Sequence, residues 1–274
     1  MNQIYRKKIF TMKHIFSFII FFLFITSQIC AQAWTDVGLK LGGGTSWLID
    51  KNIFDDNTYT HAFSGAFNIG AKASLNIGDS HSISFEAMIA KMKQNFEYSW
   101  TDDALGKQVG TNTINWTNLD LYFLYRYYSQ GAFSEIGIMR SRVQKVEQRD
   151  ALARFTNFTD VSQNYQDYYS IVFGGGAFVA GSDRFTVMLG IRIHYGLTDF
   201  VSDEGRDPIS LAAQGQSFPF PTPIRKDFSN LESNPYADEK ITRPLLVELI
   251  AEFNFGIGYF AKTICSGRVK WFGG

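Results

Sequence analysis

The chain carries eight segments in which apolar and polar residues alternate. In residues 184–197, RFTVMLGIRIHYGL, every second residue from Phe185 to Leu197 is apolar, while Arg192 and His194 lie between them. A period of two predicts a β-strand and not a helix. The other segments are residues 34–47, 62–77, 81–100, 114–128, 132–144, 167–180 and 243–260. Most are about twice as long as a usual globular strand, which favours strands that cross a membrane.

Residues 81–100 keep their alternation less cleanly than the others. Ile83, Phe85 and Ile89 are apolar at odd positions, but Phe96, Tyr98 and Trp100 follow at even positions. This switch predicts a β-bulge, or a strand that leaves the membrane.

The connections between the segments are alternately short and long. Residues 78–80, 129–131 and 181–183 form short polar joins, whereas residues 48–61, 101–113, 145–166 and 199–242 form long ones. This pattern is typical of an up-and-down barrel of the outer-membrane type. We therefore predict an all-β fold: an eight-stranded antiparallel transmembrane β-barrel with short periplasmic turns and long extracellular loops.

Alternation alone does not show which face meets lipid, because a soluble lipocalin-like barrel also alternates. Two features favour an apolar exterior: the polar faces are rich in Gly, Ser and Asn, and aromatic residues gather near both ends of the strands. The aromatic residues at the turn end are Tyr125, Tyr127, Phe133, Phe185, Tyr259 and Phe260, and those at the loop end are Trp47, Trp100, Trp116, Tyr169 and Tyr195.

Charged residues inside the strands must then face the lumen. Arg192 on the lipid face near the bilayer midplane would cost about 2–4 kcal/mol, and buried charges need partners. The alternation predicts a structural charge network in the lumen, made of Lys40, Lys72, Glu86, Asp120, Arg126, Glu135, Arg192, His194, Glu248 and Glu252. The sequence leaves the individual pairs open.

The first 33 residues differ from the rest of the chain. Arg6, Lys7, Lys8 and Lys13 precede the apolar run IFSFIIFFLFI (15–25), which is followed by TSQICAQAW. This order predicts a signal peptide over 1–33 that is removed on export, with the barrel over 34–260 and a short periplasmic tail over 261–274. Cys30 as a lipidated residue is the alternative, although the residues before it do not fit that motif. After cleavage Cys265 is the one cysteine left.

Composition changes this picture little. Lys plus Arg equals Asp plus Glu at 26 each, so no nucleic-acid partner is expected. His61 and His81 are too scattered for a metal site, and neither GGG run (42–44, 174–176) precedes a helix pattern, as a phosphate-binding loop would. We expect no metal and no cofactor. The acidic pairs 55–56 and 102–103 are read as solvated loop charge, with a divalent cation as the alternative.

The longest loop, 199–242, is the main candidate for contacts with a partner. Its stretch QGQSFPFPTPIRKDF (214–228) combines prolines with aromatic and basic residues. An extended segment of this kind can bind another protein; a flexible surface loop is the competing interpretation. The candidate contact residues are Phe218, Phe220, Arg225 and Phe228.

Two stretches resemble a known family. Residues 118–142, NLDLYFLYRYYSQGAFSEIGIMRSR, and 190–200, GIRIHYGLTDF, are similar to hallmark stretches of the small outer-membrane β-barrel proteins of Bacteroidota, which include PorT-like proteins. The resemblance covers most of residues 34–260. It implies this barrel fold and the outer membrane, and PorT-like members are implicated in type IX secretion.

These observations lead to one expected function and two alternatives. The expected function is a structural or interaction component of the cell envelope, without an open pore or enzymatic activity, that contacts outer-membrane lipid and lipopolysaccharide and protein partners in the envelope. One alternative is a lipid-modifying enzyme built on His194 with Asp199 or Ser202, although the alternation points His194 inward. The other is a narrow channel for small solutes, which eight strands leave little room for.

Overall fold

The computed structural model describes residues 33–50, 59–102, 106–150, 157–182, 184–206, 241–264 and 268–270. Eight long strands form a ring: β1 (Ala33–Ile49), β3 (Gly65–Ile77), β4 (His81–Asp102), β5 (Gly106–Ser129), β6 (Ala132–Asp150), β8 (Tyr168–Ser182), β9 (Phe185–Gly196) and β10 (Arg243–Ile264). The shorter elements are β2 (Tyr59–Ala62), β7 (Thr159–Asp160), η1 (Ser162–Asn164), α3 (Asp203–Arg206) and β11 (Arg268–Lys270). None of the helices in these ranges has the length and hydropathy to cross a bilayer.

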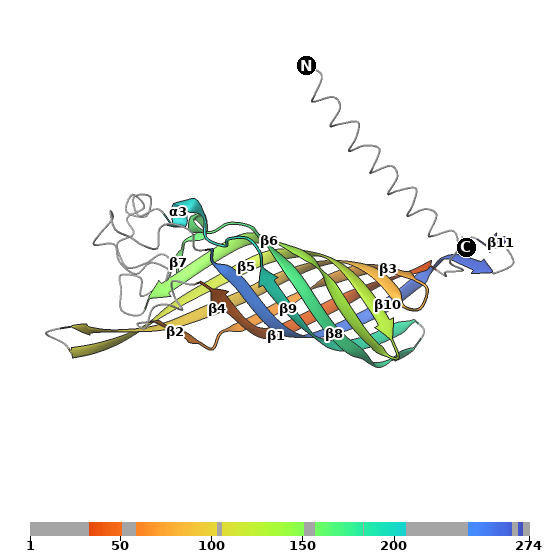
Figure 1. The fold of residues 1–274 in the computed structure, drawn as a ribbon, viewed down its shortest axis with the longest axis horizontal. Coiled ribbons are helices and arrows are strands. Elements are labelled where there is room, and N and C mark those ends of the chain that lie inside the picture. The colour runs from red at the N-terminus through yellow and green to blue at the C-terminus, as the bar shows by residue number, and fades with distance from the viewer. Residues whose placement is uncertain are drawn as a thin grey trace, which may run out of the picture.

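Each ring strand pairs with its neighbour in an antiparallel ladder, and β1 also pairs with β10. This last pairing closes the sheet, so the ring has no free edge strand. Figure 1 shows the strands tilted around a common axis. The predicted fold class, an eight-stranded antiparallel up-and-down barrel, is confirmed.

The two ends of the barrel differ as predicted from the lengths of the joins. Tight turns connect consecutive strands at one end, where Gly78, Gln130 and Gly131 have φ angles of 63°, 49° and 80°. At the other end β4 and β5 stay paired as far as Asp102 and Gly106 and project beyond the barrel (Figure 1). β2 pairs with one edge of this hairpin and β6 with the other. These ends are called the turn end and the loop end below.

The outer and inner faces of the barrel have opposite character. Outward side chains are large, apolar and exposed, including Leu39 at 60%, Ile191 at 53% and Leu249 at 67%. Inward side chains are polar and buried, including Lys40, Arg126 and Arg192, each at 0% exposed. A soluble barrel places its apolar face inside, so this inverted arrangement is that of a transmembrane barrel.

The β-bulge predicted for residues 81–100 is wrong, and the alternative, a strand that leaves the membrane, stays a prediction. Even-numbered residues of β4 remain buried from Ser82 to Phe96, and neither of its long pairings shifts register. The inner face changes instead from polar to apolar towards the loop end, where Met92 is 4% and Phe96 0% exposed. Two aromatic residues assigned to the outer girdles also lie inside: Trp116 is 1% and Phe133 5% exposed.

Register shifts occur at three places in the ring. They lie near the start of β1, between Phe178 and Ala180 of β8, and in the β5–β6 ladder at Thr117 and Asn118. In the last, Asn118 pairs with Val143 and Thr117 with Lys145, which leaves Gln144 as an extra residue. Such a bulge changes which face the following residues occupy.

Candidate functional site

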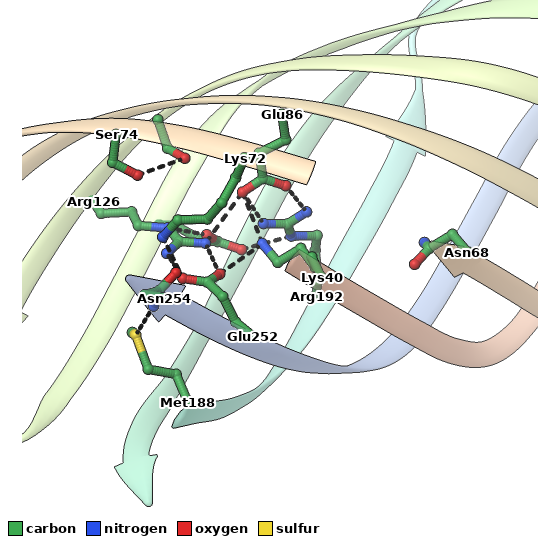
Figure 2. Close-up of polar contacts among 12 residues, drawn as sticks. Lys40, Asn68, Lys72, Ser74, Glu86, Arg126, Met188, Arg192, Glu252 and Asn254 are labelled. Atoms are coloured by element: carbon green, nitrogen blue, oxygen red, sulfur yellow. Dashed lines mark hydrogen bonds and ion pairs between the residues drawn. The ribbon is translucent and has the colours of Figure 1, made fainter. Parts of the chain in front are cut away.

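The half of the lumen towards the turn end holds a closed network of ion pairs. Arg126 donates from Nε to Glu135 at 2.7 Å and from Nη1 and Nη2 to the two oxygens of Glu252, each at 2.7 Å. Arg192 donates from Nε to Glu135 at 2.6 Å and from Nη1 to Glu86 at 2.8 Å. Figure 2 shows Glu86, Arg126, Arg192 and Glu252 converging on one another from different strands.

Two lysines complete the network. Lys40 Nζ lies 2.8 Å from Glu86 and 3.0 Å from Glu252. Lys72 pairs with Glu252, and its Nζ is 3.4 Å from Asp36. Glu252 therefore contacts three cationic side chains.

The charges of this network balance. It contains four basic residues, Lys40, Lys72, Arg126 and Arg192, and four acidic ones, Asp36, Glu86, Glu135 and Glu252. All are buried. Removing a charge from water is tolerated only when partners and hydrogen bonds replace the water. The balance and the bidentate arginine contacts meet that condition.

The backbone makes room for these long side chains. A Cβ atom at Gly174 of β8 would lie 2.6 Å from Glu135 Oε1, and one at Gly38 would lie 2.6 Å from Asn254 Oδ1. Arg192 lies over the ring of Tyr122, and Arg126 over that of Phe133, each 5.1 Å from the ring centroid. The close approach of the glycine backbone to lumen side chains, and the contacts of the arginines with aromatic rings, thus complete the packing around the guanidinium groups.

The other predicted lumen residues lie nearer the loop end. His194 Nε2 is 2.9 Å from Glu248 Oε1, its Nδ1 is 3.4 Å from Met139 Sδ, and its side chain is 2% exposed. Asn68 donates to the other oxygen of Glu248. Asp120 accepts a hydrogen bond from Ser141 at 2.6 Å, and within the described ranges no ion pair reaches it. Asp120 is thus buried in the lumen but separate from the eight-residue network.

An apolar plug closes the loop end. Phe200 is 0% exposed and packs against Tyr165, Trp116 and Tyr168, at ring-centroid distances of 4.7, 5.4 and 5.5 Å. Val161 and Val201 join the same buried cluster. Segments 157–167 and 197–206, which belong to loops, therefore fold into the barrel mouth.

Hydrogen bonds hold the plug segments in place. Asp160 accepts from the backbone N–H of Ser162 at 3.0 Å and from its hydroxyl at 2.5 Å, and these bonds lower the pKa of the Asp160 carboxyl. Ser202 N–H donates to the Asn164 carbonyl at 3.0 Å, which joins the two segments.

The lumen is more open at the turn end than at the plugged loop end. A cavity of about 550 Å³ lies there, lined by residues that include Trp34, Asp36, Tyr128, Arg184 and Asn254. Asp36 connects this cavity to the ion-pair network through Lys72.

The remaining histidines lie apart from each other. His61 contacts the Leu48 carbonyl at 3.3 Å and the Phe96 ring at 5.2 Å, and burial lowers its pKa. His81 Nδ1 lies 2.7 Å from the Tyr125 hydroxyl on the outer surface. In the part of the chain that the structure describes, no three His, Cys, Asp or Glu residues are grouped as a metal site would need.

Several predictions fall on residues outside the described ranges. These are the signal peptide as far as residue 32, the loop residues Phe218, Phe220, Arg225 and Phe228, and Cys265. Asp36 is missing from the network predicted from the sequence, although it lies on the same polar face of β1 as Lys40. The alternation placed both residues inside, and this signal could have identified Asp36.

The comparisons with known proteins bear on the fold alone. No protein-family model matches the chain, and a search of curated proteins finds no match. Among solved structures, Neisserial surface protein A is 10% identical with a TM-score of 0.38, over 81% of this chain and 97% of its own. Ail of Yersinia pestis, solved with the heparin analogue sucrose octasulfate, is 8% identical with a TM-score of 0.34, over 81% and 99%.

A third solved structure is OprG of Pseudomonas aeruginosa, an outer membrane protein. It is 9% identical with a TM-score of 0.33, over 83% of this chain and 96% of its own. The assignment of a transmembrane barrel above depends on the strand pairing and side-chain burial of this chain, not on these scores. The resemblance to the Bacteroidota family stays a prediction.

Proposed function

We propose that the protein is a closed barrel of the outer membrane that acts as a structural and interaction component of the cell envelope. The observation that carries this proposal is that side chains obstruct the lumen between its two ends. Eight charged side chains form ion pairs across the turn-end half of the lumen, and the Phe200 cluster occupies the loop-end half. A solute would have to separate buried ion pairs, which is strongly unfavourable, so the lumen serves stability and not passage.

The placement of His194 argues against a lipid-modifying enzyme. Its side chain faces the lumen, 2% exposed, and both ring nitrogens contact lumen groups. A catalytic histidine must come within hydrogen-bond distance of its substrate. A lipid outside the barrel wall cannot reach this one.

The loop end is the part of the molecule best suited to contact partners. The β4–β5 hairpin projects beyond the barrel (Figure 1), and the plug segments 157–167 and 197–206 lie at the same end. The contact segment around Phe218 and Phe228 belongs to this proposal on sequence grounds. A PorT-like role in a secretion complex rests on the family resemblance.

Two measurements test the proposal. Purified protein refolded into planar bilayers should give no steady conductance, whereas reproducible single-channel steps would contradict a closed barrel. Gentle detergent extraction from native outer membranes, followed by mass analysis, should recover the barrel with a stoichiometric envelope protein. Recovery of the barrel alone would contradict the interaction role. Absence of the protein from the outer-membrane fraction would contradict the proposed location.

A further inference from the structure

The charged residues on the outer surface of the ring strands are concentrated at one end. Among the outward side chains that the structure describes, seven are basic and two acidic, and all lie towards the loop end. The basic ones are Lys91, Lys93, Arg140, Arg142, Lys145, Arg149 and Arg243, and the acidic ones are Glu97 and Glu147. The first five of the basic residues lie on β4 and β6, on either side of β5, and are called the basic patch below.

Strand pairing places the members of the basic patch side by side. Thr117 of β5 pairs with Lys91 on one side and with Lys145 on the other. Neighbouring strands are about 4.8 Å apart, so the two lysines start about 10 Å from each other with the Thr117 side chain between them. Arg142 pairs with Leu119, one outward position closer to the turn end. Flexible Lys and Arg side chains can converge on one anion from these positions.

The β-bulge at Gln144 maintains the patch. Arg142 and Lys145 are three positions apart, which in a regular strand would put them on opposite faces. The extra residue restores Lys145 and Glu147 to the outer face, while Val146 is 0% and Gln148 2% exposed inside. Without the bulge, Lys145 would point into an apolar region of the lumen.

The basic patch borders the apolar exterior. Directly towards the turn end lie Ile89, Leu121 and Ile138, which are 54%, 47% and 56% exposed. This arrangement suits an amphiphile with an anionic head group and several acyl chains. The head group would contact the basic patch, and the chains would contact the apolar exterior.

Acidic neighbours neutralise part of the patch. Arg140 is 3.3 Å from Asp167, and Lys145 is 2.8 Å from Glu147. Exposed pairs of this kind contribute little and are readily exchanged. Lys91, Lys93 and Arg142 have no ion pair with any residue that the structure describes, so the patch keeps a net positive charge.

We propose that the basic patch binds the phosphorylated head group of a glycolipid in the outward-facing leaflet, with its acyl chains along Ile89, Leu121 and Ile138. This inference rests on the proposed location in the outer membrane, whose outward leaflet carries such glycolipids. The phosphate oxygens accept charge-assisted hydrogen bonds from Arg142, Lys91 and Lys145, and the Thr117 hydroxyl lies between the two strands that supply them.

The test uses refolded full-length barrel and bisphosphorylated lipid A in a zwitterionic detergent, with binding measured by native mass spectrometry. The variant Lys91→Gln/Arg142→Gln/Lys145→Gln removes the centre of the patch. The matched control, Arg149→Gln/Arg184→Gln/Arg243→Gln, removes the same charge elsewhere. We expect the patch variant to lose at least about tenfold in affinity and the control to lose less than about twofold. Lipid A without its phosphates should bind the native protein as weakly as bisphosphorylated lipid A binds the patch variant.

Three outcomes would overturn the inference: equal losses in both variants, undiminished binding of dephosphorylated lipid A, or equally tight binding of phosphatidylglycerol. Unboiled and boiled gel lanes show whether each variant has folded. A native protein that folds into vesicles but does not bind lipid A removes this inference and leaves the proposed function intact. A native protein that does not insert into vesicles contradicts both.

Discussion

At the scale of single residues, Glu252 is one of two lumen carboxylates, with Glu86, that each contact three cations among the described residues. It contacts Lys40, Lys72 and Arg126, so Glu252→Gln leaves buried cations short of one counter-charge. Breaking a buried ion pair from one side costs about 3–5 kcal/mol. We expect the free energy of unfolding, measured by urea titration in lipid vesicles, to fall by this amount.

Glu97→Gln is the control for this substitution, because it makes the same chemical change on an exposed side chain of the same barrel. Its effect should stay within about 0.5 kcal/mol. Equal stability of the two variants would mean that the network does not stabilise the barrel.

The run Gly42–Gly44 offers a second prediction at this scale. A Cβ at Gly42 would collide with the side chains of Asn68 and Glu248, whereas one at Gly43 meets nothing within 4 Å. Gly42→Ala should therefore lower the free energy of unfolding by about 1–3 kcal/mol through overpacking. Gly43→Ala should be neutral, or stabilising by up to about 1 kcal/mol, because Gly weakens a strand interior. The same urea titration distinguishes them, and equal losses would contradict the close approach at Gly42.

The alternation of residues could predict which side chains enter the lumen, because an unpaired charge cannot face lipid. It could not predict their partners. Arg126 on β5 reaches Glu252 on β10 across the lumen, and such a contact depends on strand tilt and barrel diameter, which no local pattern records. Asp120 illustrates the limit: its position on the inner face was predictable, but its separation from the cations was not.

At the scale of elements, the strands were predictable because one face is apolar over most of their length. The error in β4 arose where this condition fails. Beyond Ala90 the outer face carries Lys91, Lys93 and Glu97, while Met92 and Phe96 lie on the inner face, so the alternation suggests the wrong side for Phe96. The plug was not predictable for a related reason: segments 157–167 and 197–206 have no period, and their burial depends on packing with distant residues such as Trp116.

The plug is itself an element that can be tested. Phe200→Ala removes a fully buried ring that packs against three aromatic residues, a loss of about 3–5 kcal/mol of packing. Because the ring of strands closes without it, the loss should be local. We expect faster amide hydrogen exchange in 157–167 and 197–206 and unchanged exchange in β1, β9 and β10.

Leu197→Ala serves as the control, since Leu197 lies in the same segment but is 47% exposed. It should leave exchange in both plug segments unchanged. Faster exchange throughout the strands of the Phe200 variant would mean that the plug and the barrel unfold as one unit.

At the scale of the whole molecule, the barrel wall has its apolar face outward. The stability of the barrel therefore depends on whether lipid or water surrounds it. Ile138 pairs with Phe123 on β5 and Ile171 on β8, and its side chain belongs to the apolar exterior. Arginine there would have to enter hydrocarbon, so Ile138→Arg should cost about 2–4 kcal/mol in lipid vesicles. Val109, on the hairpin beyond the barrel, is the matched position, because it is similarly exposed at 61% against 56%.

Val109→Arg should change the free energy of unfolding by less than about 0.5 kcal/mol, because its side chain stays in water. The difference between the two variants separates a membrane barrel from a water-soluble one, since an exposed isoleucine in water can be replaced by arginine at little cost. A large loss for Ile138→Arg alone means that lipid covers the β5–β6–β8 wall. Small and equal effects would mean that this wall faces water, and the basic patch and the glycolipid proposed for it would lose their basis as well.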